Sequence, residues 1–238
     1  MNIRENTYDY IIVKEVVERG DYNRMTLNKD DIVLDLGAHI GAYTCLIAPS
    51  VKQVIAYEPE PSNFKLLKQN ISGLNNVTIH NEAVVPHANG KIPFYVPKSL
   101  NTGIGSIIKR KGRKEIFVDT VSFKDILDEY KPTKIKCDIE GAEYDIFAPP
   151  LKIPVTVKEI IMEVHVQGHR TEKYVPPNKQ KTLFGNVIER IPFKKYENME
   201  QYLKSQGFND IQPDRDTFLK TKGWQWVVLY KRKKEVLK

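Results

Sequence analysis

The sequence has few cysteines and no long apolar run, and both features narrow the class of protein. Its two cysteines, Cys45 and Cys137, sit inside apolar stretches, so a reducing compartment fits better than a disulfide framework. No apolar stretch approaches the ~20 residues that a membrane-spanning helix needs. Residues 1–10 lack the basic start and apolar core of a signal peptide. We therefore expect a cytoplasmic protein without a membrane span.

Repeats and low-complexity tracts are also absent, and the composition is that of a globular chain. With 238 residues, 41% of them hydrophobic, the chain can bury a sizeable core. Lys and Arg number 37 against 30 Asp and Glu, and the resulting net charge of +7 favours anionic partners without identifying one. Because no linker divides the chain, we expect a single domain over residues 1–238.

Short apolar runs alternate with longer amphipathic ones along the chain. Strands are predicted at 31–37, 53–60, 76–85, 134–141, 159–166 and 223–232, and helices at 41–51, 61–73, 122–131, 142–150 and 199–208. This alternation favours a parallel sheet with helices on both faces. Three segments interrupt it: a helical lead-in (1–30), a β-rich excursion (86–120) and a proline-containing loop (167–197). A loop of that length usually serves a site.

Two glycines follow the first predicted strand in the stretch IVLDLGAHIGAYTCL, residues 32–46. Gly37 and Gly41 bracket the strand's end, where open α/β sheets bind ligands and where glycine lets the backbone approach them. Asp35, just before them, is placed to accept from a ligand's ammonium group or to brace the turn. Residue 39 is His and no G-K-[ST] follows, so neither a dinucleotide fingerprint nor a P-loop is present. The pattern suits a zwitterionic ligand better than a phosphate.

Acidic and amide residues follow the next two predicted strands. Glu58 stands at the tip of the second strand, 23 positions after Asp35 (58 − 35), where a carboxylate hydrogen-bonds a ribose diol in nucleoside-binding sheets. Asn81 and Glu82 lie in the third, where either can meet an adenine edge. Taken singly, each residue has an ordinary explanation as a turn residue or a solvated strand end. Their order and spacing together predict S-adenosylmethionine as the ligand.

Several segments together resemble the FkbM-type family of S-adenosylmethionine-dependent methyltransferases. They are VLDLGAHIGAYT, AYEPEPSNFKLLKQN, NEAVV, VDTVSFKDIL, IKCDIEGAEYDIF and IIMEVH, of which the K-x-D-x-E-G-x-E run at 136–143 is the most specific. The resemblance implies a Rossmann-like seven-stranded sheet, mostly parallel with an antiparallel last strand, and O-methylation of a sugar or natural-product hydroxyl. It maps cofactor contacts onto Asp35, Gly37, Gly41 and Glu58. The sequence departs from the family at His39, often Asn there, and in the 167–197 insert, which is able to carry a different acceptor specificity.

Methyl transfer to a hydroxyl needs a group that removes the proton, or a metal that lowers the hydroxyl's pKa. Two predicted strands end in acidic and imidazole side chains, Asp138 and Glu140 in one and Glu163 and His165 in the other. Asp138, Glu163 and His165 are the candidate catalytic residues. Two mechanisms stay open: Asp138 or His165 as a metal-free base, or all three as ligands of Mg²⁺ or Mn²⁺. In a purely structural alternative, Glu140 caps the following helix and Glu163 pairs with a lysine.

The expected acceptor is a small molecule or a glycan, and a basic run in the sequence has two interpretations that differ in whether the acceptor is anionic. This run is IIKRKGRKE, residues 107–115. It is either solvated surface or a contact for a nucleotide sugar, a charged glycan or RNA. An RNA methyltransferase is therefore the second hypothesis. A non-catalytic binding protein on the same fold is the third, and the complete set of cofactor residues disfavours it.

Overall fold

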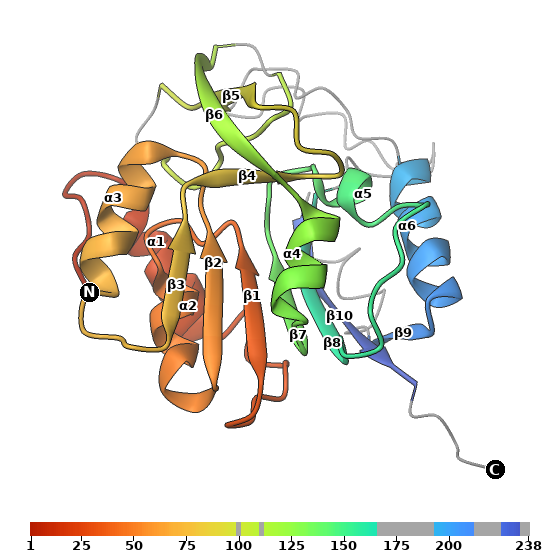
Figure 1. Ribbon diagram of the computed structural model, residues 1–238. Coiled ribbons are helices and arrows are strands. Elements are labelled where there is room, and N and C mark those ends of the chain that lie inside the picture. The colour runs from red at the N-terminus through yellow and green to blue at the C-terminus, as the bar shows by residue number, and fades with distance from the viewer. Residues whose placement is uncertain (99–100, 110–111, 166–192, 212–224, 234–238) are drawn as a thin grey trace, which may run out of the picture.

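The structure, a computed structural model, describes residues 1–98, 101–109, 112–165, 193–211 and 225–233. Seven strands form its central sheet: β1 (Ile32–Leu36), β2 (Gln53–Tyr57), β3 (Val77–His80), β7 (Lys134–Cys137), β8 (Glu159–His165), β9 (Phe208–Ile211) and β10 (Gln225–Arg232). Their order is β3-β2-β1-β7-β8-β10-β9 (Figure 1). β10 is antiparallel to both of its neighbours, and the other pairs are parallel. The predicted mostly parallel sheet with an antiparallel last strand is confirmed.

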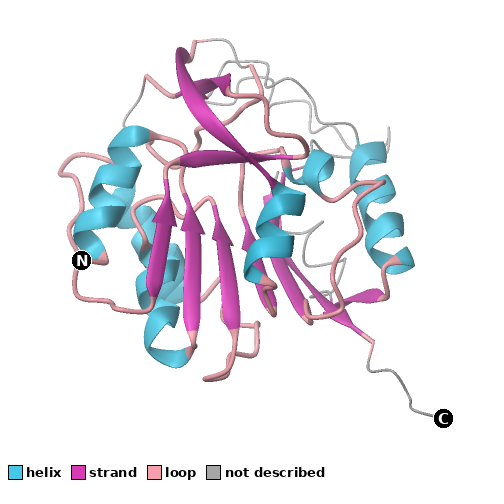
Figure 2. Cartoon of the chain, in the orientation of Figure 1, coloured by secondary structure: helices cyan, strands magenta, loops and turns pink. Residues whose placement is uncertain are grey.

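Helices cover both faces of this sheet (Figure 2). One face carries α4 (Phe123–Tyr130) and α6 (Phe193–Ser205), with the short α5 (Glu143–Ile146) near its carboxyl end. The other carries α2 (Ala42–Ile47), α3 (Pro61–Asn70), the π-helical turn η1 (Glu15–Arg19) that continues α1 (Asp9–Lys14), and the 3₁₀ turn η2 (Ala48–Ser50). No helix in the described part of the chain is long and apolar enough to cross a bilayer.

Local chemistry explains where α3 and α4 begin. The Glu60 carboxylate accepts from the backbone N–H groups of Ser62 and Asn63, and Pro61 occupies the first helical position, where its missing N–H costs nothing. Ser122 plays the same part for α4, because its hydroxyl accepts from the N–H of Asp125. Both helices are thus held at the carboxyl ends of strands.

Alternation along the strands divides the side chains between two cores. Leu34 lies in the core beneath α4 and α6, whereas its neighbour Val33 lies in the core beneath η1 and α2. The same alternation places Asp35, Lys136 and Glu163 on the η1–α2 face. Charged side chains from β1, β7 and β8 therefore approach one another on that face.

The strand predicted at 76–85 is in fact two strands that belong to different sheets. β3 ends at His80, and β4 (Glu82–Val85) joins a three-stranded sheet with β5 (Lys91–Val96) and β6 (Lys114–Ser122), in the order β4-β6-β5. This small sheet lies across the carboxyl ends of β2 and β3 (Figure 1). β5 and β6 are the β-rich excursion that the sequence predicts.

Asn81 provides a physical reason for the break between β3 and β4. Its side-chain amide donates to the backbone oxygens of Glu58 (2.8 Å) and Pro59 (3.0 Å). An Asn side chain that bonds to backbone groups competes with the regular ladder. The chain therefore leaves the main sheet at Asn81.

The last helix and the strand after it also differ from the prediction. α6 begins at Phe193, six residues before the predicted start (199 − 193), so it includes the end of the segment predicted as a long loop. The chain then turns at Gly207, with φ +85°, into β9, which the sequence analysis does not predict. The remainder of that loop, residues 167–192, lies outside the described residues.

Candidate functional site

A cavity of about 680 Å³ opens beyond the carboxyl ends of β1, β2, β7 and β8. Residues that follow β1, β2 and β7 line its base, and parts of β4 and β5 line one side. Another side is formed by α1, η1 and Tyr22, which belong to residues 1–30, called the N-terminal segment from here on. Ligands bind at this edge of an open α/β sheet, so the cavity is the candidate functional site.

Gly37 lines the cavity at a turn that only glycine fits. Its φ is +78°, and its N–H and that of Ala38 donate to the carbonyl of Tyr57, both at 3.0 Å. A Cβ on Gly37 would lie 1.8 Å from the backbone oxygen of Asp138. The turn therefore lets β1, β2 and β7 end close together.

Glu58 lines the cavity and is 5% exposed. Its Oε2 accepts from the N–H of His39 at 2.8 Å, and its Oε1 accepts from the N–H of Glu60 at 3.0 Å and from Asn63 Nδ2 at 3.3 Å. Burial raises the pKa of Glu58 to about 7, although these hydrogen bonds oppose the shift. Hydroxyl groups of a ligand would favour its charged form.

The sequence predicts that Asp35 contacts the cofactor, but Asp35 does not line the cavity. Its carboxylate is fully buried, accepts from the Thr44 hydroxyl at 2.6 Å, and lies 3.2 Å from Lys136 Nζ. Lys136 does line the cavity, and its ammonium group also donates to the carbonyl of Gly37 at 2.8 Å. Burial acts against the charge of Lys136, but Asp35 and Asp138 outweigh it and raise the pKa. Asp35 therefore braces the turn through Lys136.

The remaining predicted cofactor residues are divided between the cavity and the structure around it. Gly41 has φ +88° and packs against α3, because a Cβ there would lie 2.7 Å from Leu67 Cδ1. Asn81 holds the loop after β2, as described above. Neither residue lines the cavity, whereas Glu82 does.

Two of the predicted catalytic residues meet at one hydroxyl group. The hydroxyl of Tyr22 lies 3.0 Å from Asp138 Oδ2 and 3.1 Å from Glu163 Oε2, and all three residues line the cavity. Burial, together with the two carboxylates, raises the pKa of Tyr22 well above its ordinary value, so the Tyr22 hydroxyl stays protonated at neutral pH and serves as a hydrogen-bond donor. A phenol has one proton, so it donates to one carboxylate at a time.

The third predicted catalytic residue is placed by its backbone only. His165 ends β8 and pairs with Gln225 of β10, and its side chain lies outside the described residues. Within the residues that the structure describes, no group of three or more His, Cys, Asp or Glu side chains is arranged to hold a metal ion. Asp138 and Glu163 are two of the three ligands that the metal hypothesis names, and that hypothesis stays a prediction.

In the structural alternative, Glu140 caps the following helix, but Glu140 does not occupy the cap position. The residue that precedes α5 is Ala142, which makes no side-chain cap hydrogen bond. Instead, Glu143 accepts from the N–H of Gly141 at 2.7 Å, while Glu140 adopts φ +57° and its carbonyl accepts from Ser106 at 2.8 Å. The left-handed conformation of a non-glycine residue beside a cavity is typical of functional loops.

The described basic side chains of the basic run do not line the cavity, although Ile107 at the start of the run does. Lys109 and Lys114 are exposed, and Arg113 donates to the carbonyl of Ile104. None of these three lines the cavity. Any contact between these side chains and an acceptor therefore lies outside the candidate site.

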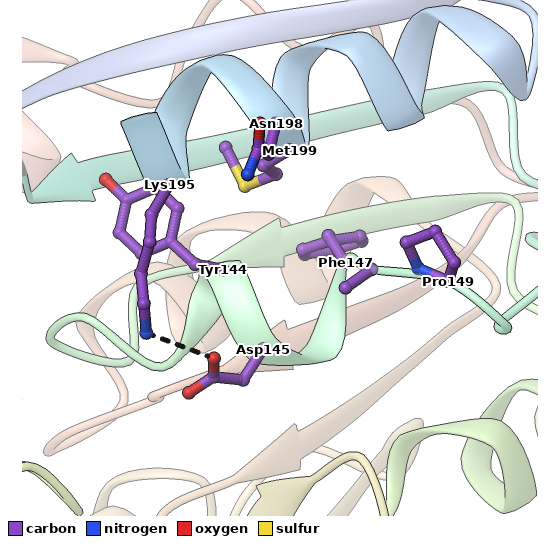
Figure 3. A pocket seen from close by; sticks show the side chains of 8 residues that line it. Tyr144, Asp145, Phe147, Pro149, Lys195, Asn198 and Met199 are labelled. Carbon is purple, nitrogen blue, oxygen red and sulfur yellow. Dashed lines mark hydrogen bonds and ion pairs between the residues drawn. The ribbon is translucent and has the colours of Figure 1, made fainter. Parts of the chain in front are cut away.

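A second, smaller hollow of about 210 Å³ lies between α5 and α6 (Figure 3). Its lining includes Tyr144, Phe147, Pro149 and Met199, and one ion pair joins Lys195 Nζ to Asp145 Oδ1 at 3.4 Å. It shares no lining residue with the larger cavity. The predicted cofactor and catalytic residues that line a cavity all belong to the larger one.

Two solved structures with this fold are methyltransferases. The methyltransferase FkbM from Methylobacillus flagellatus matches with a TM-score of 0.51 and 16% identity, over 92% of this chain and 47% of that one. The precorrin-6y C5,15-methyltransferase from Geobacter metallireducens matches with a TM-score of 0.50 and 11% identity, over 95% and 92%. The chain therefore shares the fold of these two methyltransferases, a Rossmann-like seven-stranded sheet.

The family follows from the sequence. The methyltransferase FkbM domain matches residues 35–209, and the chain belongs to this family. It is 24% identical over 159 residues to the hexuronic acid methyltransferase AglP of Haloferax volcanii, covering 64% of this chain and 65% of that protein. It is 32% identical over 74 residues to the ribosomal RNA small subunit methyltransferase A of Latilactobacillus sakei, covering 31% and 23%. The chain thus spans less than two thirds of both curated relatives.

Proposed function

We propose that the chain is an S-adenosylmethionine-dependent O-methyltransferase that acts on a hydroxyl of a sugar, a glycan or a small natural product. The observation that carries this proposal is the cavity, which holds Glu58 together with Tyr22, Asp138 and Glu163. The 24% identical relative named for hexuronic acid supports a sugar as the acceptor. Glu58 would receive the ribose hydroxyls of the cofactor, and Glu82 would lie on the adenine side.

Asp138 is the proposed general base. When bound, S-adenosylmethionine supplies an electrophilic methyl group. Asp138 would accept the proton that the acceptor hydroxyl releases as its oxygen bonds to the methyl group, whose bond to the cofactor's sulfur would break. The Tyr22 hydroxyl lies 3.0 Å from Asp138 and 3.1 Å from Glu163 and donates to one of them at a time, so one carboxylate is oriented by it in the absence of the acceptor.

The direct test offers labelled cofactor to neutral sugars, uronic acids, natural products and RNA. We expect label on a sugar or natural-product hydroxyl. Label on RNA alone would replace the proposal by the RNA methyltransferase alternative, which the basic run and the short match to a ribosomal RNA methyltransferase favour. Cofactor binding without transfer to any acceptor would favour a non-catalytic binding protein.

Chelation separates the proposed base from a metal mechanism at Asp138, Glu163 and His165. We expect full turnover in EDTA, because the Tyr22 hydroxyl already lies within 3.1 Å of both carboxylates that such an ion would need. Turnover is measured with and without EDTA, alongside S-adenosylhomocysteine affinity. Activity that disappears in EDTA and returns with Mn²⁺ or Mg²⁺, while cofactor affinity is unchanged, would establish the metal mechanism.

Glu58 makes cofactor affinity depend on pH. Since burial raises its pKa in the free protein to about 7, its ionisation opposes folding, and this contribution weakens the fold as pH rises from about 4.5 to 7. Ribose hydroxyls would stabilise the carboxylate, so binding strengthens over the same rise. Between pH 6 and pH 8 we expect S-adenosylhomocysteine to bind about tenfold more tightly, as measured by calorimetry.

The matched control for this dependence is Glu58→Gln. It keeps the shape of the side chain, removes the titration, and should bind at least ~10-fold more weakly than wild type at pH 8, because hydrogen bonds to charged groups contribute ~1.5–3 kcal/mol. An equal pH dependence in this variant would exclude Glu58 as the titrating group. Wild-type affinity at pH 8 would remove it from the ribose site.

A further inference from the structure

The N-terminal segment contains a buried ion pair that the proposed mechanism does not use. Asp9, the first residue of α1, is fully buried, and Arg4 donates to it from Nε at 2.8 Å, from Nη2 at 2.9 Å and from its backbone N–H at 3.0 Å. Burial alone would raise the pKa of Asp9, but the hydrogen bonds from Arg4 and Thr102 lower it to about 2. The carboxylate is therefore charged throughout the physiological range.

Arg4 connects this ion pair to one oxygen of Glu58. Its Nη2 donates to Asn63 Oδ1 at 2.7 Å, which fixes the orientation of the Asn63 amide. The Nδ2 of that amide then faces Glu58 Oε1 at 3.3 Å and the carbonyl of Thr102 at 3.2 Å. With the amide turned over, its oxygen would face two acceptors and its nitrogen would face the Arg4 guanidinium, so Arg4 acts together with Glu58 and Thr102 to fix the amide.

Asp9 connects the ion pair to the other oxygen of Glu58. The Thr102 hydroxyl donates to Asp9 Oδ1 at 2.6 Å and lies 3.0 Å from His39 Nε2. Thr102 has one hydroxyl proton, so it accepts from His39, and burial lowers the pKa of His39 to about 4, which leaves a neutral ring protonated at Nε2. The backbone N–H of His39 donates to Glu58 Oε2 at 2.8 Å.

These contacts form a closed ring of hydrogen bonds, which we call the Arg4–Asp9 ring. Its members are Glu58, Asn63, Arg4, Asp9, Thr102 and His39. They come from the end of β2, from α3, from the N-terminal segment and from the loops after β1 and β5. The ring thus joins the carboxylate proposed for the ribose to α1, which itself lines the cavity.

We propose that Arg4 and Asp9 are positioning residues of the cofactor site, which orient Glu58 through Asn63 and His39 and fasten the N-terminal segment over the cavity. The inference rests on the proposed binding of S-adenosylmethionine there. Cofactor binding and docking of the N-terminal segment then stabilise each other, because both depend on the same arrangement of Glu58. Neither residue touches the reacting atoms.

The test measures S-adenosylhomocysteine affinity at pH 8 in Arg4→Met, Asp9→Asn and the double variant. Each single change should weaken binding about tenfold. The double variant should bind S-adenosylhomocysteine at most about twofold more weakly than the weaker-binding single variant does, since both changes open one ring. The control is Asp31→Asn, a buried carboxylate that accepts from Thr133 at 2.6 Å and from the N–H of Asn28 at 2.8 Å, away from the cavity. It should lower the melting temperature and leave affinity within twofold.

The outcomes separate this inference from the proposed function. If wild type does not bind S-adenosylhomocysteine, both fail. If wild type binds and Glu58→Gln weakens binding while Arg4→Met does not, the positioning role alone is overturned. It is overturned as well if Asp31→Asn loses as much affinity as Asp9→Asn. Should Asp9→Asn not fold, amide exchange of wild type decides: protection of residues 9–19 must rise on adding S-adenosylhomocysteine, and unchanged protection overturns the inference.

Discussion

Replacing Asp138 with asparagine should lower the turnover of methyl transfer by about 10²–10⁴-fold, the usual contribution of a general base. Asparagine keeps an oxygen that can accept from the Tyr22 hydroxyl, which lies 3.0 Å from Asp138 Oδ2. The packing around Tyr22 should therefore persist, and S-adenosylhomocysteine affinity should stay within twofold of wild type. Turnover is measured with the acceptor that the labelling panel identifies, and affinity by calorimetry.

The matched control for Asp138 is Asp145→Asn. Asp145 lies two residues after the K-x-D-x-E-G-x-E run, and its side chain is 47% exposed beside Lys195. Losing an exposed ion pair seldom changes stability by more than ~1 kcal/mol, so this variant should keep wild-type turnover. Wild-type turnover in Asp138→Asn would transfer the role of base to another residue, with Glu163 and His165 the next candidates.

Replacing Gly37 with alanine should destabilise the protein by more than ~4 kcal/mol and abolish cofactor binding. The new Cβ would lie 1.8 Å from the backbone oxygen of Asp138, so the end of β7 would have to move. Asp138 and Glu58 would then no longer face the same cavity. Melting temperature and S-adenosylhomocysteine affinity measure the two effects.

Gly90→Ala is the control that isolates the steric contact. Gly90 also has a positive φ, +60°, but a Cβ there would meet nothing within 4 Å. Its cost should be only the ~1–2 kcal/mol of a left-handed alanine. Equal melting temperatures for the two variants would show that the turn at Gly37 tolerates a side chain and that the contact with Asp138 relaxes easily.

Local signals in the sequence were sufficient for most of the fold. The alternating pattern predicts six of the seven strands of the main sheet, and the resemblance adds the antiparallel last strand. The alternating pattern does not predict β9, whose four residues follow α6 after a single turn at Gly207. Nor does the pattern separate β3 from β4, because the break depends on Asn81 reaching the carbonyls of Glu58 and Pro59 in the loop after β2.

The structure brings some of the predicted site residues to one cavity and leaves others outside it. Gly37, Glu58, Glu82, Asp138 and Glu163 line the cavity, and their roles stay predictions. Asp35 and Gly41 stand in the recognised pattern, yet they serve the turn behind the cavity, through Lys136 and Leu67 respectively. A spacing pattern shows that a turn is needed but not which of its side chains face the ligand.

What the sequence by itself determined is the part that depends on near neighbours: strand and helix periodicity, the glycine turn, and acidic residues at strand ends. Only the tertiary structure decided which distant residues complete the site. Tyr22 lies 116 and 141 positions from the two carboxylates that it joins, and Arg4 lies 59 positions from Asn63. No local pattern marks such residues, because their roles arise when folding brings the N-terminal segment against the carboxyl edge of the sheet.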